Sequence, residues 1–437
     1  MKSHGVVIIA LIAIAVLGIA YSQLSPNLAP RVYSQCITPP VYPQMIMQSG
    51  KICSGTYNYG IGIGANNVKI NCQAGTSFNG AGWNGLNGLT IINMSNVTVQ
   101  GCSFSNFNDG IYLEGQPNAF YSSKEIYLLN LVSRNNNGNG IYIGQNVENV
   151  TLKDSNITSN NFEGILLTSN YFGLVSAAAS MFPDKIKVLN NQITNNGNNG
   201  IYLNQLDYFA HTPGVISVNN SVEIVNNFIS HNMENGIKNT GADASASSIL
   251  RNYINNNGIS GISIRGEKSI NLVNNSNFTY FYIRSSFGNI ALNDLIGNGQ
   301  DGLQMYSTRL SNVNSAHNVN PGNVYGNFIE NNGRNGINYD AEDYSTSHLG
   351  HFIFYANILQ NDITNNGREG FYFDEGANFT SGLDTVMPLI RCNDILSNGG
   401  GTASGIKIKA LYISHGTFWI FDENIILWNR DNNVRDG

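Results

Sequence analysis

The amino-acid sequence predicts an all-β protein in which the chain winds into one right-handed parallel β-helix, a solenoid of about eleven coils. Three observations lead to this prediction. A short motif made of a polar residue, a glycine and an apolar residue recurs along the chain, and an asparagine-rich motif precedes many of its copies. The composition fits as well, because 47 of the 437 residues are glycine and 42% are hydrophobic, whereas only 11% are charged.

The N-terminal residues are expected to direct export. A basic start precedes an apolar run from Val6 to Ala20, which is shorter than the roughly 20 residues that span a bilayer. We expect residues 1–22 to be a signal peptide or a retained N-terminal membrane anchor, or to carry a pilin-type cleavage site at Gly5. Each alternative places the rest of the chain outside the cytoplasm. Residues 23–57 are expected to form a linker and an N-terminal cap, and residues 58–437 the β-helix.

The five cysteines agree with export. Cys36, Cys53 and Cys72 lie close together before the regular repeats, where a disulfide between two of them would staple the N-terminal end in an oxidising compartment. The three candidates allow several pairings, among which the sequence does not choose. Cys102 and Cys392 lie inside repeats and are expected to be buried thiols.

The polar–Gly–apolar motif sets the register of the repeats. Its glycines are spaced from 24 residues (Gly140 to Gly164) to 41 residues (Gly261 to Gly302), a scale that is typical of solenoids. Apolar and polar residues alternate after each glycine, which predicts a strand with one inward and one outward face. Positions one and three after the glycine should point inward, and positions two and four outward. The inward stack should contain Ile111, Ile141, Ile165, Ile201, Ile237, Ile262 and Ile337.

The second motif, Asn-x-Ile-x-Asn-Asn-Gly, predicts a corner after a short strand. Copies start at Asn191, Asn327 and Asn361. Asparagine and glycine tolerate the left-handed backbone that tight corners require. We expect stacked asparagines to form an amide ladder, in which each side chain donates to one neighbour and accepts from the other. The expected members are Asn195, Asn256, Asn298, Asn331 and Asn365.

The repeats resemble those of the right-handed parallel β-helix superfamily typified by pectate lyases, and within it the carbohydrate-binding and sugar-hydrolase repeat proteins. The resemblance covers residues 58–437, and segment 68–75 is similar to the first full coil of many exported members. The superfamily includes lyases, glycoside hydrolases, epimerases, phage tailspikes and non-catalytic surface proteins. The resemblance therefore implies a fold and leaves the function open.

The catalytic motifs of well-known members are missing from the sequence. A polygalacturonase would carry Asn-Thr-Asp, a paired Asp-Asp, Gly-His-Gly and Arg-Ile-Lys, and segment 406–409 imitates only the last of these. The Asp-Pro-His of alginate epimerases is absent, and no calcium-and-arginine signature of pectate lyases stands out. These absences disfavour the best-known enzymes and leave room for a divergent one.

A candidate active site comes from the outward position four. Equivalent residues of successive coils lie about 4.8 Å apart, so Asp340 and Asp374 should be neighbours, flanked by Tyr306 and Lys409. Two carboxylates at roughly 5 Å suit a retaining glycosidase, and their repulsion should raise the pKa of one of them, as a general acid requires. Alternatively, the two carboxylates share a calcium ion, or they form a solvated charge pair without a catalytic role.

The segment that follows Asp340 is unusually polar for this chain. It contains Glu342, Asp343, His348 and His351, which are residue types that bind metals or act as bases. The alternative interpretation is a polar loop at a coil corner, because no recognised spacing of metal ligands is met.

A second outward column, at position two, is rich in tyrosine. Aromatic rings with polar tips stack on sugar rings and bond to sugar hydroxyls, although tyrosine also suits strand surfaces in general. The expected substrate-binding residues are Tyr112, Tyr142, Tyr202 and Tyr372 of this column together with Tyr306 and Lys409 of position four.

Two functions are compatible with these features. The first is an exported or cell-surface protein that interacts with polysaccharide and, if catalytic, is a glycoside hydrolase or polysaccharide lyase. The second is a non-catalytic stalk, adhesin or envelope protein. A net charge of −6 without a basic block argues against nucleic acid as a partner. Contact with a membrane is expected only through the N-terminal segment. Calcium is the one cofactor that the sequence suggests.

The C-terminal end of the solenoid is expected to need a cover. The last coil runs through Trp419 and Trp428, and Arg435 begins another copy of the motif. The end of a solenoid otherwise exposes its core and unpaired strand edges. We expect either that the two tryptophans close this end or that it associates with another copy or a partner.

Overall fold

The structure is a computed structural model. It describes residues 36–40, 45–81, 85–116, 123–170, 182–206, 221–240, 243–265, 285–309, 317–343, 352–354, 356–374, 385–386, 389–399, 406–409, 420–422, 424–427 and 434–436. The expected targeting segment 1–22 lies outside these residues. The chain divides into two compact units, Met1–Ile37 and Thr38–Gly437, and the second contains the repeats. In the described part of the chain, no helix is present that could cross a membrane.

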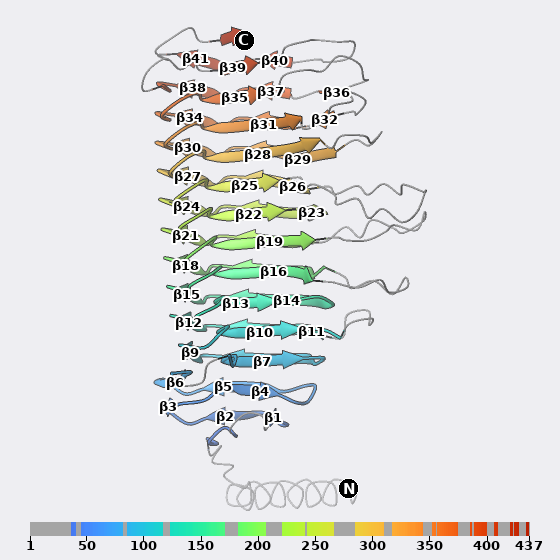
Figure 1. Cartoon of the computed structure of the whole chain (residues 1–437), viewed down its shortest axis with the longest axis vertical. Coiled ribbons are helices and arrows are strands. Elements are labelled where there is room, and N and C mark those ends of the chain that lie inside the picture. Colours follow the sequence, from blue (N-terminus) through green and yellow to red (C-terminus); the bar gives the residue numbers. More distant parts are fainter. Residues whose placement is uncertain are drawn as a thin grey trace, which may run out of the picture. The chain divides into compact units, whose positions relative to one another are not determined.

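Three parallel sheets make up the second unit, and each turn of the chain contributes one strand to each sheet (Figure 1). Sheet 1 contains β1 (Met45–Ile46), β4 (Ile61–Ile63), β7 (Leu89–Ile92), β10 (Ile111–Glu114), β13 (Ile141–Ile143), β16 (Ile165–Asn170), β19 (Ile201–Leu206), β22 (Ile237–Thr240), β25 (Ile262–Arg265), β28 (Leu303–Arg309), β31 (Ile337–Asp343), β35 (Phe371–Asp374), β39 (Ile406–Lys409) and β42 (Val434–Asp436).

The other two sheets follow in the same order along the chain. Sheet 2 contains β2 (Gly50–Ile52), β5 (Lys69–Cys72), β8 (Ser95–Gln100), β11 (Ser123–Leu129), β14 (Val147–Lys153), β17 (Asp184–Leu189), β20 (Val222–Val225), β23 (Asp243–Leu250), β26 (Ser285–Ala291), β29 (His317–Tyr325), β33 (Asn357–Leu359), β37 (Leu389–Arg391) and β40 (Ile420–Asp422), with β32 (Phe352–Phe354) beside β29 and β36 (Thr385–Val386) beside β32. Sheet 3 contains β3 (Gly55–Tyr57), β6 (Thr76–Asn79), β9 (Ser103–Ser105), β12 (Val132–Arg134), β15 (Asn156–Thr158), β18 (Gln192–Thr194), β21 (Phe228–Ser230), β24 (Tyr253–Asn255), β27 (Asp294–Ile296), β30 (Phe328–Glu330), β34 (Asp362–Thr364), β38 (Asp394–Leu396) and β41 (Ile425–Leu427).

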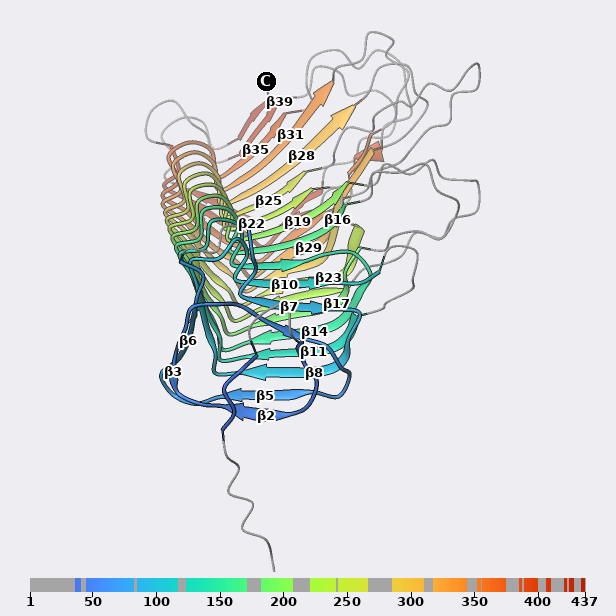
Figure 2. The same ribbon diagram turned by 60° about the horizontal axis from the view of Figure 1, so that its bottom comes forward.

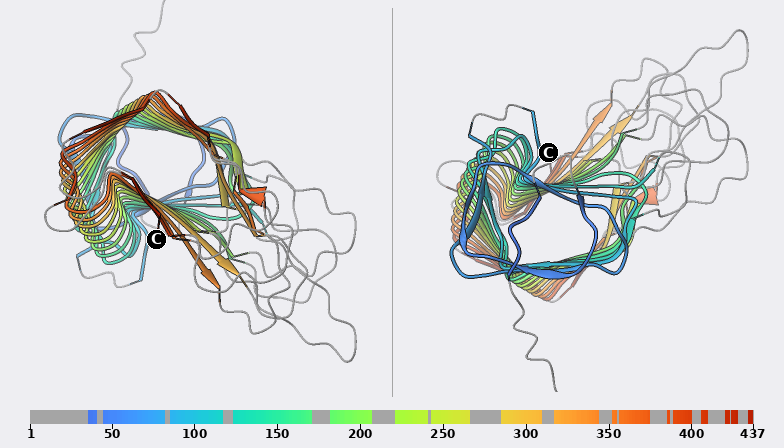
Figure 3. Two further views of the ribbon diagram at one scale, coloured as in Figure 1. Left: turned by 90° about the horizontal axis from the view of Figure 1, so that it is seen from above. Right: turned by 90° about the horizontal axis from the view of Figure 1, so that it is seen from below.

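The predicted fold class is confirmed: the chain is a right-handed parallel β-helix. Successive coils superimpose when the stack is viewed along its length (Figure 3), and strands of sheets 1 and 2 occupy different faces (Figure 2). Among the described strands, sheets 1, 2 and 3 contain 14, 15 and 13 members, which is more than about eleven coils. The sheets begin with β1, inside the segment expected to be linker and cap.

The predicted inward register is also confirmed. Ile111 pairs with Ile141, Ile141 with Ile165, and the same column continues to Ile337 through sheet 1. The seven predicted isoleucines are each 0% exposed. Position three is inward too, as Leu113 shows. Positions two and four point away from this core, because side chains alternate along a strand. Their exposure varies, and Thr168, Thr240, Ser263 and Asn338 are buried.

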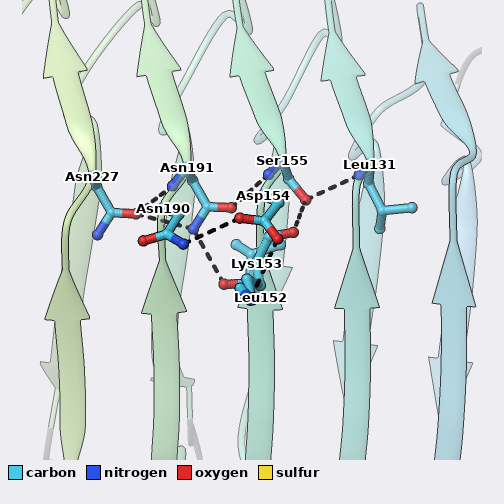
Figure 4. A network of polar contacts seen from close by, with 8 residues as sticks. All are labelled: Leu131, Leu152, Lys153, Asp154, Ser155, Asn190, Asn191 and Asn227. Carbon is cyan, nitrogen blue, oxygen red and sulfur yellow. Dashed lines mark hydrogen bonds and ion pairs between the residues drawn. The ribbon is translucent and has the colours of Figure 1, made fainter.

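Two buried amide ladders occupy the corners on either side of sheet 3. One contains Asn191, Asn227, Asn252, Asn293, Asn327, Asn361 and Asn393; the other contains Asn136, Asn160, Asn196, Asn232, Asn257, Asn298, Asn332, Asn366 and Asn398. Figure 4 shows the start of the first, where Leu131 N–H donates to Ser155 Oγ at 3.0 Å and Ser155 N–H donates to Asn191 Oδ1 at 2.9 Å. A buried amide needs such partners, since an unpaired polar group loses its bonds to water.

The ladder membership predicted from the sequence is wrong for four of five residues. Asn298 is a member, but Asn195, Asn256, Asn331 and Asn365 each precede a ladder residue and are not in the interior. These four have φ of +52° to +58°, so they form the left-handed corner itself. In each Asn-Asn pair, the first residue therefore turns the chain and the second enters the ladder.

The cysteine prediction is corrected in two respects, for Cys102 and for Cys392. Cys72 forms a disulfide with Cys102, which was expected to be a buried thiol. Cys36 and Cys53 are disulfide-bonded as well, and Cys392 carries a half-buried thiol. Cys72 and Cys102 lie 30 residues apart in sequence, on neighbouring coils, with their Cα atoms 5.1 Å apart. The coil length brings them together, and this is not visible in the spacing of the first three cysteines.

Candidate functional site

Strand pairing in sheet 1 brings several predicted site residues into neighbouring register positions. At position four, strand pairing puts Tyr306 beside Asp340, Asp340 beside Asp374, and Asp374 beside Lys409. The side chains of Asp374 and Lys409 lie outside the described residues, so the register fixes only their backbone neighbours. The side chains of Glu342 and Asp343, together with His348 and His351, also lie outside the described part.

The tyrosine rings of sheet 1 make contacts between neighbouring coils. Tyr112 and Tyr142 stack with ring centroids 4.7 Å apart and planes inclined by 4°. Lys238 Nζ lies 5.0 Å from the ring centre of Tyr202, and Arg265 Cζ lies 4.7 Å from that of Tyr306. Each of these rings therefore turns a face towards a neighbouring coil.

A further row of side chains was missed by the sequence reasoning. The first residue of the polar–Gly–apolar motif is acidic in several coils, and it is buried rather than exposed. The buried acids are Asp109, Glu163, Asp301 and Glu369. The signal was present in the motif itself, because four carboxylates at one repeat position are unusual in a chain with 11% charged residues.

Asp301 is the most enclosed of these acids, with 0% exposure. Its Oδ1 accepts bonds from the backbone N–H and from Nδ2 of Asn335, both at 3.0 Å. Its Oδ2 accepts a bond from Asn338 Nδ2 at 3.1 Å. Burial raises the pKa of Asp301, and these bonds together with the charge of Arg334 offset part of the rise.

Glu163 and Asp109 have the same character. Burial raises the pKa of both carboxyl groups, while donors from asparagines counteract it. Asn198 Nδ2 donates to Glu163 Oε1 at 3.2 Å, and Asn139 donates to Asp109 Oδ1 through its backbone N–H at 2.8 Å and Nδ2 at 3.0 Å. The acids are thus held by neutral amides, which support a carboxylate without neutralising it.

Charged side chains flank the buried acids. Glu234, two residues before a motif glycine, contacts Lys238, two residues after it, with Oε2 and Nζ 3.7 Å apart. Arg334 and Arg368 occupy the position of Glu234 in later coils, as backbone bonds between those coils show. Carboxylates, guanidinium groups and amides thus lie together at one edge of sheet 1.

A second carboxylate pair lies on sheet 3. Strand pairing puts Asp362 beside Asp394. Burial, followed by the charges of Asp394 and Glu330, raises the pKa of Asp362. Chain topology thus produces in-register acids on two different sheets. Among the described side chains, no group of three or more histidine, cysteine or acidic residues is arranged to hold a metal ion.

No family model and no curated protein matches the chain. Solved structures with a similar course of the chain include the periplasmic alginate epimerase AlgG, which is 13% identical over 87% of this chain and 78% of that chain, with a TM-score of 0.44. The mannuronan C-5 epimerase AlgE4 A-module of Azotobacter vinelandii is 13% identical over 89% of both chains, with a TM-score of 0.45. The catalytic unit of a GH87 α-1,3-glucanase from Streptomyces thermodiastaticus is 12% identical over 88% of this chain and 62% of that chain, with a TM-score of 0.41. At these identities the likeness is one of fold.

Proposed function

We propose that this chain binds a polysaccharide along the outward face of sheet 1. The observation that carries the proposal is the in-register column of polar side chains, in which Arg265, Tyr306, Asp340 and Asp374 follow one another. Coils repeat at about 4.8 Å, which is close to the length of one sugar residue in an extended glycan. A glycan lying parallel to the stack therefore meets an equivalent position at each residue.

The chemistry of the face suits hydroxyl groups. Carboxylates accept bonds from sugar hydroxyls, whereas guanidinium groups donate to sugar oxygens. The tyrosines contribute hydroxyls and ring edges, because Tyr112, Tyr142, Tyr202 and Tyr306 direct ring faces at neighbouring coils. Recognition in this proposal depends on hydrogen bonds rather than on stacking of aromatic faces against sugars.

We also propose that the chain is exported and works at the cell surface or outside the cell. The disulfide between Cys72 and Cys102 supports this location, because such bonds persist in oxidising compartments. The apolar run at residues 6–20 is the segment that would direct export or hold the protein at a membrane.

Hydrolysis of the bound glycan is a second candidate function. Pairing of Asp340 with Asp374 on adjacent strands favours it, because the separation of neighbouring strands, about 4.8 Å, suits the carboxylates of a retaining glycosidase. One carboxyl would protonate the leaving oxygen while the other attacks the sugar and the glycosidic bond breaks. Water, deprotonated by the first carboxylate, would then release the sugar from the second. The same pair could instead bind calcium, which takes carboxylate oxygens as ligands.

The test is a glycan array with the full chain, followed by assays for new reducing ends and for unsaturated products. Binding to a polysaccharide that is lost in Arg265→Ala and Asp340→Asn supports the proposal. Release of reducing ends from that glycan adds hydrolysis. Absence of binding to acidic and neutral polysaccharides alike contradicts both functions.

A further inference from the structure

Tyr112, Glu114 and Tyr142 form a small preorganised group near the N-terminal end of sheet 1. The hydroxyl of Tyr112 donates to Glu114 Oε2, two residues further along β10. The Tyr142 ring lies parallel to the Tyr112 ring at 4.7 Å. The bond from Tyr112 fixes one carboxylate oxygen of Glu114, and Glu114 is only half-buried, so it remains accessible from outside.

Gly144 is required for this arrangement. A Cβ atom at Gly144 would lie 2.8 Å from Cε1 of Tyr142 and 3.4 Å from Cγ of Glu114. Contacts under 3 Å force one of the groups to move, and here it would be an aromatic ring packed against another ring. The missing side chain thus allows Tyr142 to lie over position four, where it supports Tyr112.

The electrostatic surroundings favour an uncharged ligand. Burial and the bond to Glu114 raise the pKa of the Tyr112 hydroxyl, and the charges of Glu114, Tyr142 and Asp109 contribute less. The hydroxyl therefore stays protonated and remains a donor to Glu114. The carboxylate of Glu114 repels an anionic sugar, whereas sugar hydroxyl groups donate to it without a charge penalty.

We propose that Glu114 is the hydrogen-bond acceptor of a subsite for neutral sugar residues, and that Tyr112, Tyr142 and Gly144 are its positioning residues. This inference rests on the proposed binding of polysaccharide and names a substrate class for one part of that surface. The subsite belongs to coils β10 and β13, well separated along the sheet from Asp340 on β31. Tyrosine serves here to orient a carboxylate rather than to stack on a sugar.

The test measures the affinity of the full chain for cellohexaose and for hexagalacturonate by calorimetry. Glu114→Gln keeps the shape and removes the charge, and it should weaken cellohexaose binding about tenfold, which is what a lost bond to a charged group implies. Tyr112→Phe keeps the stacked ring and removes only the hydroxyl, and it should weaken binding by a smaller factor. Gly144→Ala should act like Tyr112→Phe, because it displaces Tyr142.

The matched control is Glu148→Gln, since Glu148 is a half-buried glutamate on sheet 2 that contacts Lys185. It should leave the affinity unchanged, and circular dichroism should show intact β-structure in each variant. Unchanged cellohexaose binding in Glu114→Gln overturns the subsite and leaves the proposed function standing. Tighter binding of hexagalacturonate than of cellohexaose by the wild type also overturns it. If the wild type binds neither probe and no glycan on the array, both the subsite and the proposed function are overturned.

Discussion

Asn196 donates twice to one oxygen atom of Asn232, through its backbone N–H at 3.1 Å and through Nδ2 at 2.9 Å. Asn232 repeats the arrangement towards Asn257 on the next coil, at 3.1 and 3.0 Å. Each asparagine thus accepts hydrogen bonds from the preceding member of the ladder and donates hydrogen bonds to the next member. The corner of the β-helix is consequently stabilised by hydrogen bonds between coils rather than within one coil.

Replacing a central ladder residue should be strongly destabilising. Asn232→Ala leaves the backbone N–H of Asn196 without an acceptor, its Nδ2 with only the carbonyl of Ile157 at 3.5 Å, and Asn257 Oδ1 with fewer donors. Each unsatisfied buried group costs about 1–3 kcal/mol, so we expect a loss of about 3 kcal/mol or more in the free energy of unfolding. Denaturant unfolding followed by circular dichroism measures it.

The control for this prediction is the corner residue that precedes a ladder position. Asn195 is exposed with φ of +58°, and glycine adopts this conformation readily. Asn195→Gly should therefore change stability little. Equal losses from Asn232→Ala and Asn195→Gly would mean that the ladder does not stabilise the corner as described.

Removing the disulfide between Cys72 and Cys102 should destabilise the N-terminal coils. The bond spans 30 residues, and closing a loop of that length in the unfolded chain contributes about 3–4 kcal/mol. Cys102→Ala should lower the midpoint of thermal unfolding, whereas Cys392→Ser should not. Because neighbouring coils in a solenoid unfold semi-independently, protection from hydrogen exchange should fall mainly in β5 to β9. Uniform loss across all coils would argue against this local role.

Asp301 should make stability decrease as pH rises. Burial raises its pKa above the ordinary 3.8, so the folded state binds the proton more tightly than the unfolded state does. Its stabilising effect is present below pH 3.8 and is lost as pH rises through the higher folded pKa. The free energy of unfolding of Asp301→Asn, relative to that of the wild type, should therefore be higher at pH 7 than at pH 4. Denaturant unfolding of both proteins at the two pH values measures this difference. The exposed Asp154→Asn provides the comparison, and an identical pH profile for Asp301→Asn and wild type would refute the assignment.

Asp340→Asn and Asp374→Asn should abolish any glycan hydrolysis or calcium binding. Their thermal stability should stay nearly unchanged, because surface substitutions outside the core usually stay within about 0.5 kcal/mol. Asp362→Asn and Asp394→Asn are matched controls, since they alter another in-register carboxylate pair on sheet 3. Loss of activity in the sheet 3 variants, or a large fall in stability in the sheet 1 variants, would speak against the site.

The inward register could be read from the sequence because it depends on a local property. Alternation after each motif glycine assigns Ile111 and Leu113 to the interior, and both are buried. Because side chains alternate along a strand, only one of two sets of residues can face the interior, and hydrophobicity indicates which set it is. Neighbours at position four, such as Asp340 and Asp374, then follow from aligning the motifs.

Other features required the three-dimensional path of the chain. Asn195 and Asn196 have the same side chain, and both suit a corner, so composition does not say which one enters the ladder. The partner of Cys72 depends on the length of a coil rather than on the nearest cysteine in sequence. The direction of the Tyr112 and Tyr142 rings depends on Gly144, whose role is visible only once the coils are stacked.

The corner geometry also affects how readily asparagines of this protein deamidate. Asn-Gly sequences ordinarily deamidate, because the glycine nitrogen attacks the side-chain carbonyl of the asparagine to form a succinimide ring, and asparagine counts among the thermolabile residues for this reason. In this β-helix the nitrogen of Gly197 instead donates to the carbonyl of Asn160 at 2.8 Å, while the side chain of Asn196 is fixed to the next coil. Gly258, Gly333, Gly367 and Gly399 are held in the same way. In these five Asn-Gly pairs deamidation should therefore be slow while the protein is folded, and it should begin where coils open.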